Sequence, residues 1–160
     1  KYNAETALRN IENTRAALPG VQFTTDFIVG FPGETDEDFA ETMEFARRVG
    51  FLATHVFKYS KRAGTPAAKM PDQVPKAVKE ARAARAAAVA AELEDAFHSA
   101  LIGTVQEVLF EQPEDGLYAG HAPNYAKVYT APGELHNAVR RVRITELCRD
   151  GVFGVLTDTP

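Results

Sequence analysis

Helical and strand patterns alternate along the first 60 residues of the chain. Residues 4–17 carry apolar side chains at helical spacing. A second helix is predicted from a cap at Thr35 or Asp36 to about Val49, and Gly50 is placed to end it. Residues 21–30 and 52–59 are rich in β-branched and aromatic side chains, which favours strands. This order is typical of a parallel sheet wrapped by helices. Because two strands cannot form a sheet that is covered on both faces, we interpret the region as part of a larger layered domain or barrel.

The second half of the chain has a different texture. A proline-containing loop at 60–75 leads to a predicted helix at 76–101, in which 11 of the 26 residues are alanine. Five short β-rich runs follow, separated by Gly, Pro and Asn, and they predict a small closed or partly open barrel. We therefore expect an α/β region at 1–100 and an all-β barrel at 101–160. The five runs are 104–111, 116–120, 124–130, 139–147 and 152–157.

Composition limits the kinds of protein that this chain can be. Its net charge is −4, which argues against binding nucleic acid by bulk positive charge, so any such binding must use a local patch. No apolar run approaches the ~20 residues of a membrane span. No apolar segment of the kind found in signal peptides follows the first residues. We therefore expect a cytoplasmic protein that does not contact a membrane.

Ligands for metal and redox chemistry are scarce. The single cysteine, Cys148, has no partner for an internal disulfide and cannot hold an iron–sulfur cluster alone. Because it follows Leu147 at the end of an apolar run, we predict that it is a small core residue. The four histidines are scattered without metal-binding spacing, so the sequence predicts no metal site.

The turn after the strand at 21–30 is the first candidate site. It lies at the carboxyl end of that strand, the edge at which ligands bind in α/β barrels and open sheets. Gly30 and Gly33 would let the backbone approach a ligand closely, and Glu34 could accept hydrogen bonds from an amine or a ribose. A tight turn with a glutamate near a helix N-terminus explains the same residues. The spacing leaves both interpretations open.

A second candidate site follows the next strand and lies at the same edge of the predicted sheet. Residues 58–66 hold three cations, a phenol and two hydroxyl groups, among them Tyr59 and Arg62. One interpretation is a wall of a cofactor or phosphate pocket. The other is a solvated loop.

Aromatic and basic side chains alternate on two strands of the predicted barrel. Strand periodicity places Tyr125, Lys127 and Tyr129 on one face, and it places Arg141 and Arg143 together on another strand. Rings interleaved with cations suit single-stranded RNA, whose bases stack and whose phosphates pair with basic groups. An exposed polar face without a ligand is the alternative, because the barrel segment holds 5 basic residues against 8 acidic ones.

Two stretches together resemble the methylthiotransferase branch of the radical S-adenosylmethionine (radical SAM) enzymes. Thr-Thr-Asp-Phe-Ile-Val-Gly-Phe-Pro-Gly-Glu-Thr at 24–35 is similar to the fifth strand and turn of that family's barrel, and residues 59–68 are similar to the segment after the sixth strand. The final barrel resembles a TRAM domain, the RNA-binding module of these enzymes. Residues 55–57 and 123–125 are most similar to the MtaB-type enzymes, which act on N6-threonylcarbamoyladenosine next to the anticodon in tRNA.

The resemblance implies that the chain is the C-terminal part of a larger enzyme and holds the last two strands of its βα barrel. The family uses S-adenosylmethionine and two four-iron four-sulfur clusters, but its cluster cysteines, including a CxxxCxxC motif, have no counterpart here. We therefore expect no cofactor bound to this chain alone and no catalytic residue in it. The residues implied to line the cofactor site are Asp26, Ile28, Gly30, Phe31, Gly33, Glu34, Tyr59 and Arg62.

The resemblance also implies partners. These are the anticodon stem-loop of a tRNA, the N-terminal part of the same enzyme, and a second copy that pairs with the exposed edges of the incomplete barrel. Two alternatives stay open: an RNA-binding module without enzymatic activity, and part of an enzyme that methylthiolates a ribosomal protein. The turn at 30–34 favours an enzyme over a plain binding module, and His55 with residues 123–125 favours tRNA.

Overall fold

The computed structural model describes residues 3–157. The three helices have the bounds predicted from the sequence, and the strands differ from the predicted runs only at their ends. No helix in the described part of the chain is both long and apolar enough to cross a membrane. In chain order, the elements are α1 (Ala4–Ala17), β1 (Thr24–Val29), α2 (Asp36–Val49), β2 (Ala53–Lys58), a 3₁₀ helix (Ala67–Lys69), α3 (Lys76–Leu101), β3 (Val105–Glu114), β4 (Leu117–His121), β5 (Lys127–Thr130), β6 (Ala138–Cys148) and β7 (Gly151–Leu156).

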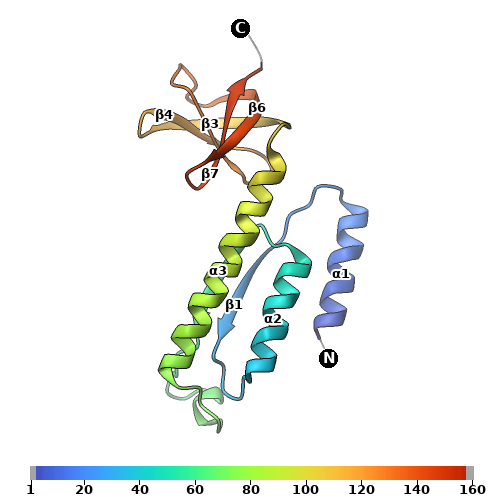
Figure 1. The fold of residues 1–160 in the computed structure, drawn as a ribbon, viewed down its shortest axis with the longest axis vertical. Coiled ribbons are helices and arrows are strands. Elements are labelled where there is room, and N and C mark those ends of the chain that lie inside the picture. Colours follow the sequence, from blue (N-terminus) through green and yellow to red (C-terminus); the bar gives the residue numbers. More distant parts are fainter. Residues whose placement is uncertain (1–2, 158–160) are drawn as a thin grey trace. The chain divides into compact units, whose positions relative to one another are not determined.

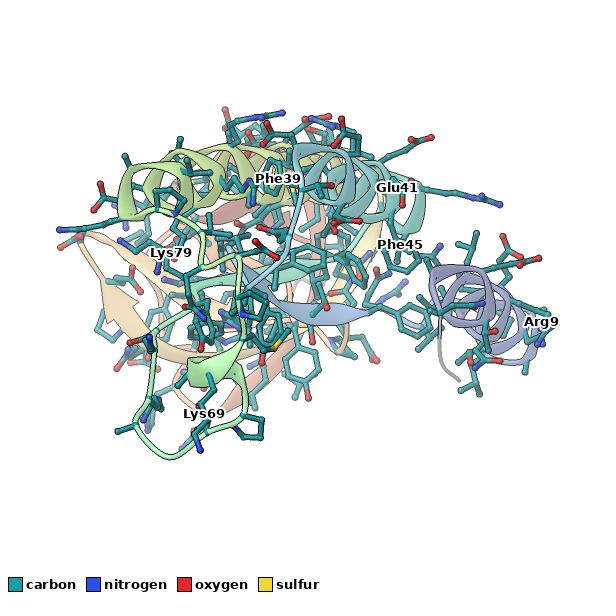
Figure 2. The ribbon with its side chains drawn as sticks, turned by 90° about the horizontal axis from the view of Figure 1, so that it is seen from below. Arg9, Phe39, Glu41, Phe45, Lys69 and Lys79 are labelled. Atoms are coloured by element: carbon teal, nitrogen blue, oxygen red, sulfur yellow. The ribbon has the colours of Figure 1, made fainter. Side chains whose placement is uncertain are left out.

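The chain divides between Glu94 and Asp95 into two compact units, each with its own hydrophobic core. In the first unit, β1 and β2 form a parallel two-stranded sheet, in which Thr24 lies opposite Ala53. Figure 2 shows α2 and α3 side by side on one side of these strands, with α1 beyond α2. The molecule is therefore of mixed α/β class, as the element order predicted.

Helix α2 owes its bounds to local sequence signals. Thr35 and Asp38 form a reciprocal capping box, in which the Thr35 hydroxyl accepts from the Asp38 amide at 3.1 Å. Gly50 ends the helix in the left-handed conformation at φ +63°, where a side chain would be strained. Between these caps, a buried stripe that includes Phe39 and Met43 packs into a core to which α3 also contributes. Figure 1 shows α2 between α3 and α1.

The second unit is a closed five-stranded barrel with the strand order β3-β4-β5-β7-β6. Its interior is filled by apolar side chains, among them the fully buried Val108, Phe110 and Ile144. Strands approach closely where glycine replaces a side chain: a Cβ at Gly120 would lie 2.3 Å from the Leu109 carbonyl oxygen. The predicted strands are all present, and they close into a barrel.

Candidate functional site

A pocket of about 410 Å³ lies at the carboxyl ends of β1 and β2. It brings together four of the residues predicted to line a cofactor site, although they come from two separate segments of the chain, the end of β1 with its turn and the loop after β2. This is the edge at which ligands bind in α/β folds. The lining residues are Ile28, Phe31, Phe57, Lys58, Tyr59, Ser60, Arg62, Thr65 and Ala67.

The pocket has an apolar side that is open to solvent. Ile28 and Phe57 are register partners on the sheet face away from α2 and α3, and they are 59% and 53% exposed. Phe31 is 42% exposed and meets Tyr59 edge to face, with 5.3 Å between the ring centroids. Large apolar side chains left open side by side mark a surface that binds a partner or a flat apolar ligand.

The Tyr59 hydroxyl is a polar group of the pocket that lacks a hydrogen-bond partner within the described residues. Its oxygen is buried, and it has no hydrogen-bond partner among residues 3–157. Buried polar groups in native proteins almost always have a partner, so an orphaned hydroxyl beside a pocket fits a site completed by a ligand or by further protein.

Glu34 has structural partners in the turn. Its Oε2 accepts from the Gly30 amide at 2.6 Å and from Arg82 Nη1 at 2.6 Å. Arg82 also donates to the Glu34 carbonyl oxygen at 3.0 Å and to Asp36 Oδ1 at 2.7 Å. The structure thus supports the turn interpretation of Glu34, because this carboxylate holds Gly30 and α3 in place.

The two glycines of the turn differ in the space around them. Gly30 has φ +72°, and an added Cβ would lie 2.1 Å from Lys79 Cγ, so the side chain of Lys79 on α3, and not a ligand, fills the space beside Gly30. Gly33 has φ +85° with open space beside it, and its amide donates to the Asp72 carbonyl oxygen at 3.0 Å. Both positions require glycine for the turn itself.

Asp26 lies outside the pocket lining, on the uncovered face of the sheet, where His55 is its register partner. This face carries Asp26 and His55 as one pair and the apolar Ile28 and Phe57 as the next. The predicted cofactor residues therefore fall into two groups. One lines the pocket, and the other builds the turn and the sheet behind it.

In the barrel, Tyr125 is the aromatic side chain best placed for a ligand. It is 81% exposed and has φ +66°, a conformation that is uncommon for residues other than glycine. The loop that holds it is closed by bonds from the Tyr125 amide to the Ala122 carbonyl at 2.9 Å and from the Ala122 amide to the Ala126 carbonyl at 3.0 Å.

Tyr129 corrects the predicted aromatic face, because its side chain is completely buried. Lys127 and Arg149 lie against its ring, and its hydroxyl donates to Asp150 Oδ1 at 2.5 Å. Lys127 itself contacts Glu114 and Asp150, each at 3.0 Å. Tyr129 is therefore closed to base stacking, and Lys127 is occupied by carboxylates.

This cluster shifts the protonation of its members. A hydrogen bond with Tyr129, more than the ion pairs, raises the pKa of Lys127, and burial opposes the shift. The bond from Lys127 lowers the pKa of Glu114, and the bond from Tyr129 lowers that of Asp150. All three groups are held in their charged forms at neutral pH.

The two arginines of β6 lie on the outside of the barrel, as strand alternation predicted. Arg141 and Arg143 are exposed, and the intervening Val142 is fully buried. Arg143 donates to the Gly103 carbonyl at 3.3 Å, and Glu107 is the register partner of Arg141. The face is therefore polar with a mixed charge.

The structure corrects the prediction for Cys148. This cysteine ends β6 and is half-buried, so it is not a core residue. Residues 3–157 contain no group of three or more histidine, cysteine or acidic side chains that could hold a metal ion.

Sequence reasoning missed three residues of the site: Phe57, Lys79 and Arg82. Phe57 has a local signal, since it alternates with the partly buried Val56 and falls on the uncovered face. Lys79 and Arg82 lie three residues apart on α3, at helical spacing for one face. Lys79 contacts the Tyr59 carbonyl, which is 20 positions away in sequence, and Arg82 contacts Glu34, which is 48 positions away. Only the fold reveals these contacts.

Comparison with known proteins first gives a broad class. Residues 1–46, which include β1 and the turn after it, match the radical SAM superfamily. A more specific likeness covers 98% of the chain. Over 160 residues, the chain is 41% identical to the tRNA-2-methylthio-N(6)-dimethylallyladenosine synthase of Maricaulis maris (strain MCS10). Both findings support the radical SAM methylthiotransferase family. The chain spans 35% of the length of that relative.

Proposed function

We propose that this chain is the C-terminal portion of a tRNA methylthiotransferase that acts in the cytoplasm. The pocket at the carboxyl ends of β1 and β2 carries the proposal, because it gathers exposed apolar side chains at the ligand-binding edge of a parallel sheet. Residues 1–100 would supply the last two strands and helices of the radical SAM barrel, and residues 101–160 a TRAM-like barrel. The similarity to a tRNA-modifying synthase along nearly the whole chain supports this arrangement.

The pocket residues fit the adenosyl part of S-adenosylmethionine. Ile28 and Phe31 would pack against the adenine ring, the orphaned Tyr59 hydroxyl would gain a partner, and Arg62 would face the cofactor or the tRNA. S-adenosylmethionine supplies the radical chemistry when it is bound in the complete enzyme. The part of that work done by this chain is to bind, to orient and to exclude water.

The iron–sulfur clusters of the family do not fit the residues of this chain. Its one thiol, Cys148, lies at the end of β6 in the barrel unit, and a four-iron cluster takes several thiolates. The ligands would therefore come from the N-terminal part of the enzyme, which would also complete the barrel along β1.

The barrel is proposed to hold the anticodon stem-loop of the tRNA. Tyr125 would stack on a base, and Arg141 and Arg143 would contact phosphates. Lys127 and Tyr129 would support the barrel through their bonds to Glu114 and Asp150, without touching RNA.

Two adenosine derivatives are candidate substrates. Residues 55–57 and 123–125 resemble enzymes that act on N6-threonylcarbamoyladenosine, and the Maricaulis relative is named for dimethylallyladenosine. We propose the threonylcarbamoyl form, with the dimethylallyl form as the second candidate.

A chimera tests the proposal. The chain would replace the matching C-terminal part of the Maricaulis relative. The chimera would be expressed in a host that lacks the synthases for both candidate substrates, and mass spectrometry would measure methylthiolated nucleosides in its tRNA. We expect a methylthiolated adenosine to appear, and its side group identifies the substrate. An Ile28→Asp chimera should lose the product, whereas Leu18→Asp, a change at a side chain of similar exposure (58%), should keep it.

A soluble chimera that holds its clusters and cleaves S-adenosylmethionine, yet modifies no tRNA, would contradict the proposal. Methylthiolation of a ribosomal protein in its place would favour the alternative substrate. Binding of RNA by the chain with no product from any chimera would favour the non-enzymatic module.

A further inference from the structure

Positive charge is concentrated in one short segment beside the pocket. Residues 58–79 hold six of the 18 basic residues and one carboxylate, Asp72. The rest of the chain holds 12 basic residues against 21 acidic ones. An acidic protein that gathers its cations on one segment has a local surface for an anionic partner, despite its net charge. The five exposed cations of this segment, here called the basic rim, are Lys58, Lys61, Arg62, Lys69 and Lys76.

The cations of the basic rim are available to a partner. Lys58, Lys61, Arg62 and Lys69 form no ion pair with any carboxylate in the part of the chain that the structure describes. Lys76 is 88% exposed and lies 3.8 Å from Glu80, a contact that water and salt screen. Cations elsewhere, such as Arg82 and Lys127, are held by carboxylates at 3.0 Å or less.

The basic rim borders the cofactor pocket and continues beyond it. Lys58, Tyr59 and Ser60 line this pocket and also a neighbouring one of about 260 Å³, to which α3 contributes Lys76 and Lys79. Cations therefore lie on both sides of Tyr59. Figure 2 shows Lys69 on the loop and Lys79 on the helix side, so the charge extends across the loop.

The loop that carries the basic rim is held in place by hydrogen bonds. The Thr65 hydroxyl donates to the Arg62 carbonyl at 2.8 Å, and Gln73 Nε2 donates to two carbonyls of the 3₁₀ turn at 3.0 Å. Lys79 Nζ donates to the Tyr59 carbonyl at 3.1 Å, which ties the loop to α3. An ordered loop loses little conformational entropy when a partner binds.

We propose that the basic rim binds the phosphate backbone of the substrate RNA at the mouth of the cofactor pocket. Four of its five cations are lysines, which contact phosphates as point charges without reading base sequence. They are spread along the loop instead of converging on one point, as an extended polyanion requires. The proposal rests on the proposed function for the identity of the RNA, and it places the main electrostatic contact in the first unit, outside the barrel.

The test compares two triple variants of the full 160-residue chain. Lys61→Gln/Lys69→Gln/Lys76→Gln removes three charges from the basic rim, and Arg9→Gln/Arg47→Gln/Arg48→Gln removes three exposed charges from α1 and α2. The probe is a fluorescein-labelled anticodon stem-loop RNA, and anisotropy is measured between about 50 and 200 mM salt. Thermal melts by circular dichroism check that both variants are folded.

We expect the rim variant to bind roughly tenfold more weakly at low salt, with a salt slope smaller by roughly 2, because about one counterion is released for each phosphate contact. The α1–α2 variant should bind like the wild type. Equal losses of affinity in both variants would overturn the proposal, since bulk charge would explain them. Unchanged RNA binding by the rim variant would also overturn it, as would a chain that binds an acidic protein but not RNA. The two proposals can be told apart. If the chimera makes no methylthiolated nucleoside while the rim variant still loses affinity for RNA, the proposed function is wrong and the RNA-binding role of the basic rim stands.

Discussion

Arg82 connects the turn after β1 to α3, the helix that supports it. This side chain is buried and bridges Glu34 and Asp36, and Glu34 in turn fixes the Gly30 amide. Its hydrogen bond to Asp36, and less so that to Glu34, raises the pKa of Arg82 against the effect of burial, so the guanidinium stays charged. One side chain on α3 therefore sets the shape of a turn that lies more than 40 residues earlier.

Replacing Arg82 with methionine should destabilise the first unit by about 3 kcal/mol, because the half-buried Glu34 carboxylate loses its charged partner. Urea unfolding followed by circular dichroism measures the change. Arg85→Met is the matched control, since Arg85 is exposed and only lies over the Phe39 ring, and it should cost less than about 1 kcal/mol. Equal costs for the two variants would show that the bridge does not hold the turn.

Tyr125 combines an 81% exposed side chain with a strained backbone, a combination that indicates binding more than stability. Tyr125→Gly removes both the ring and the strain. We expect its unfolding free energy to stay equal or rise by up to about 1 kcal/mol, while its affinity for the anticodon stem-loop falls about tenfold. Tyr125→Phe keeps the ring and should bind like the wild type. A Tyr125→Gly protein that binds RNA normally would remove Tyr125 from the interface.

At the scale of elements, the sequence predicts what local signals determine. The bounds of α2 follow from the Thr35 cap and Gly50, both of which act within a few residues. The prediction that Tyr129 can stack on a base was wrong because Arg149, from the β6–β7 turn, covers its ring, and strand alternation cannot reveal such a contact. The role of Glu34 was equally hidden, since its partner comes from α3.

The charged cluster that joins β3, β5 and the β6–β7 turn should make barrel stability depend on pH. Glu114 and Asp150 have lowered pKa values, so their contribution is present above the unfolded values near 4 and is lost as the pH falls. Lys127 has a raised pKa, so its contribution is present below about pH 10 and is lost above that. Arg149 also supports the cluster, because its side chain donates to the Glu114 and Asp115 carbonyls.

Urea midpoints measured from about pH 2 to 7 test this dependence. The wild type should lose stability below about pH 4, and Lys127→Met should be less stable at pH 7 with a shallower loss in acid. Lys76→Met removes an exposed lysine with a distant partner and should follow the wild-type profile. A Lys127→Met profile parallel to the wild type would show that the cluster does not control acid stability.

The whole molecule has one closed sheet and one open sheet. The barrel strands close on themselves, whereas β1 and β2 pair only with each other within residues 3–157 and leave Ile28 and Phe57 exposed. Unpaired strand edges next to apolar side chains promote association with other strands. The same surface that would receive the N-terminal part of the enzyme is therefore open to a second copy of this chain.

We expect the isolated chain to associate as its concentration rises, which sedimentation velocity measures. Phe57→Lys places a charge on the uncovered face and should shift the chain towards monomer. Leu109→Lys makes the same change at an apolar side chain that is 45% exposed on the barrel, and it should leave association unchanged. If the chain stays monomeric at every concentration, or if both substitutions change association equally, the open sheet does not drive self-association. If Phe57→Lys reduces association, adding the N-terminal part of the proposed enzyme should abolish association of the wild type, because both partners would cover the same open sheet.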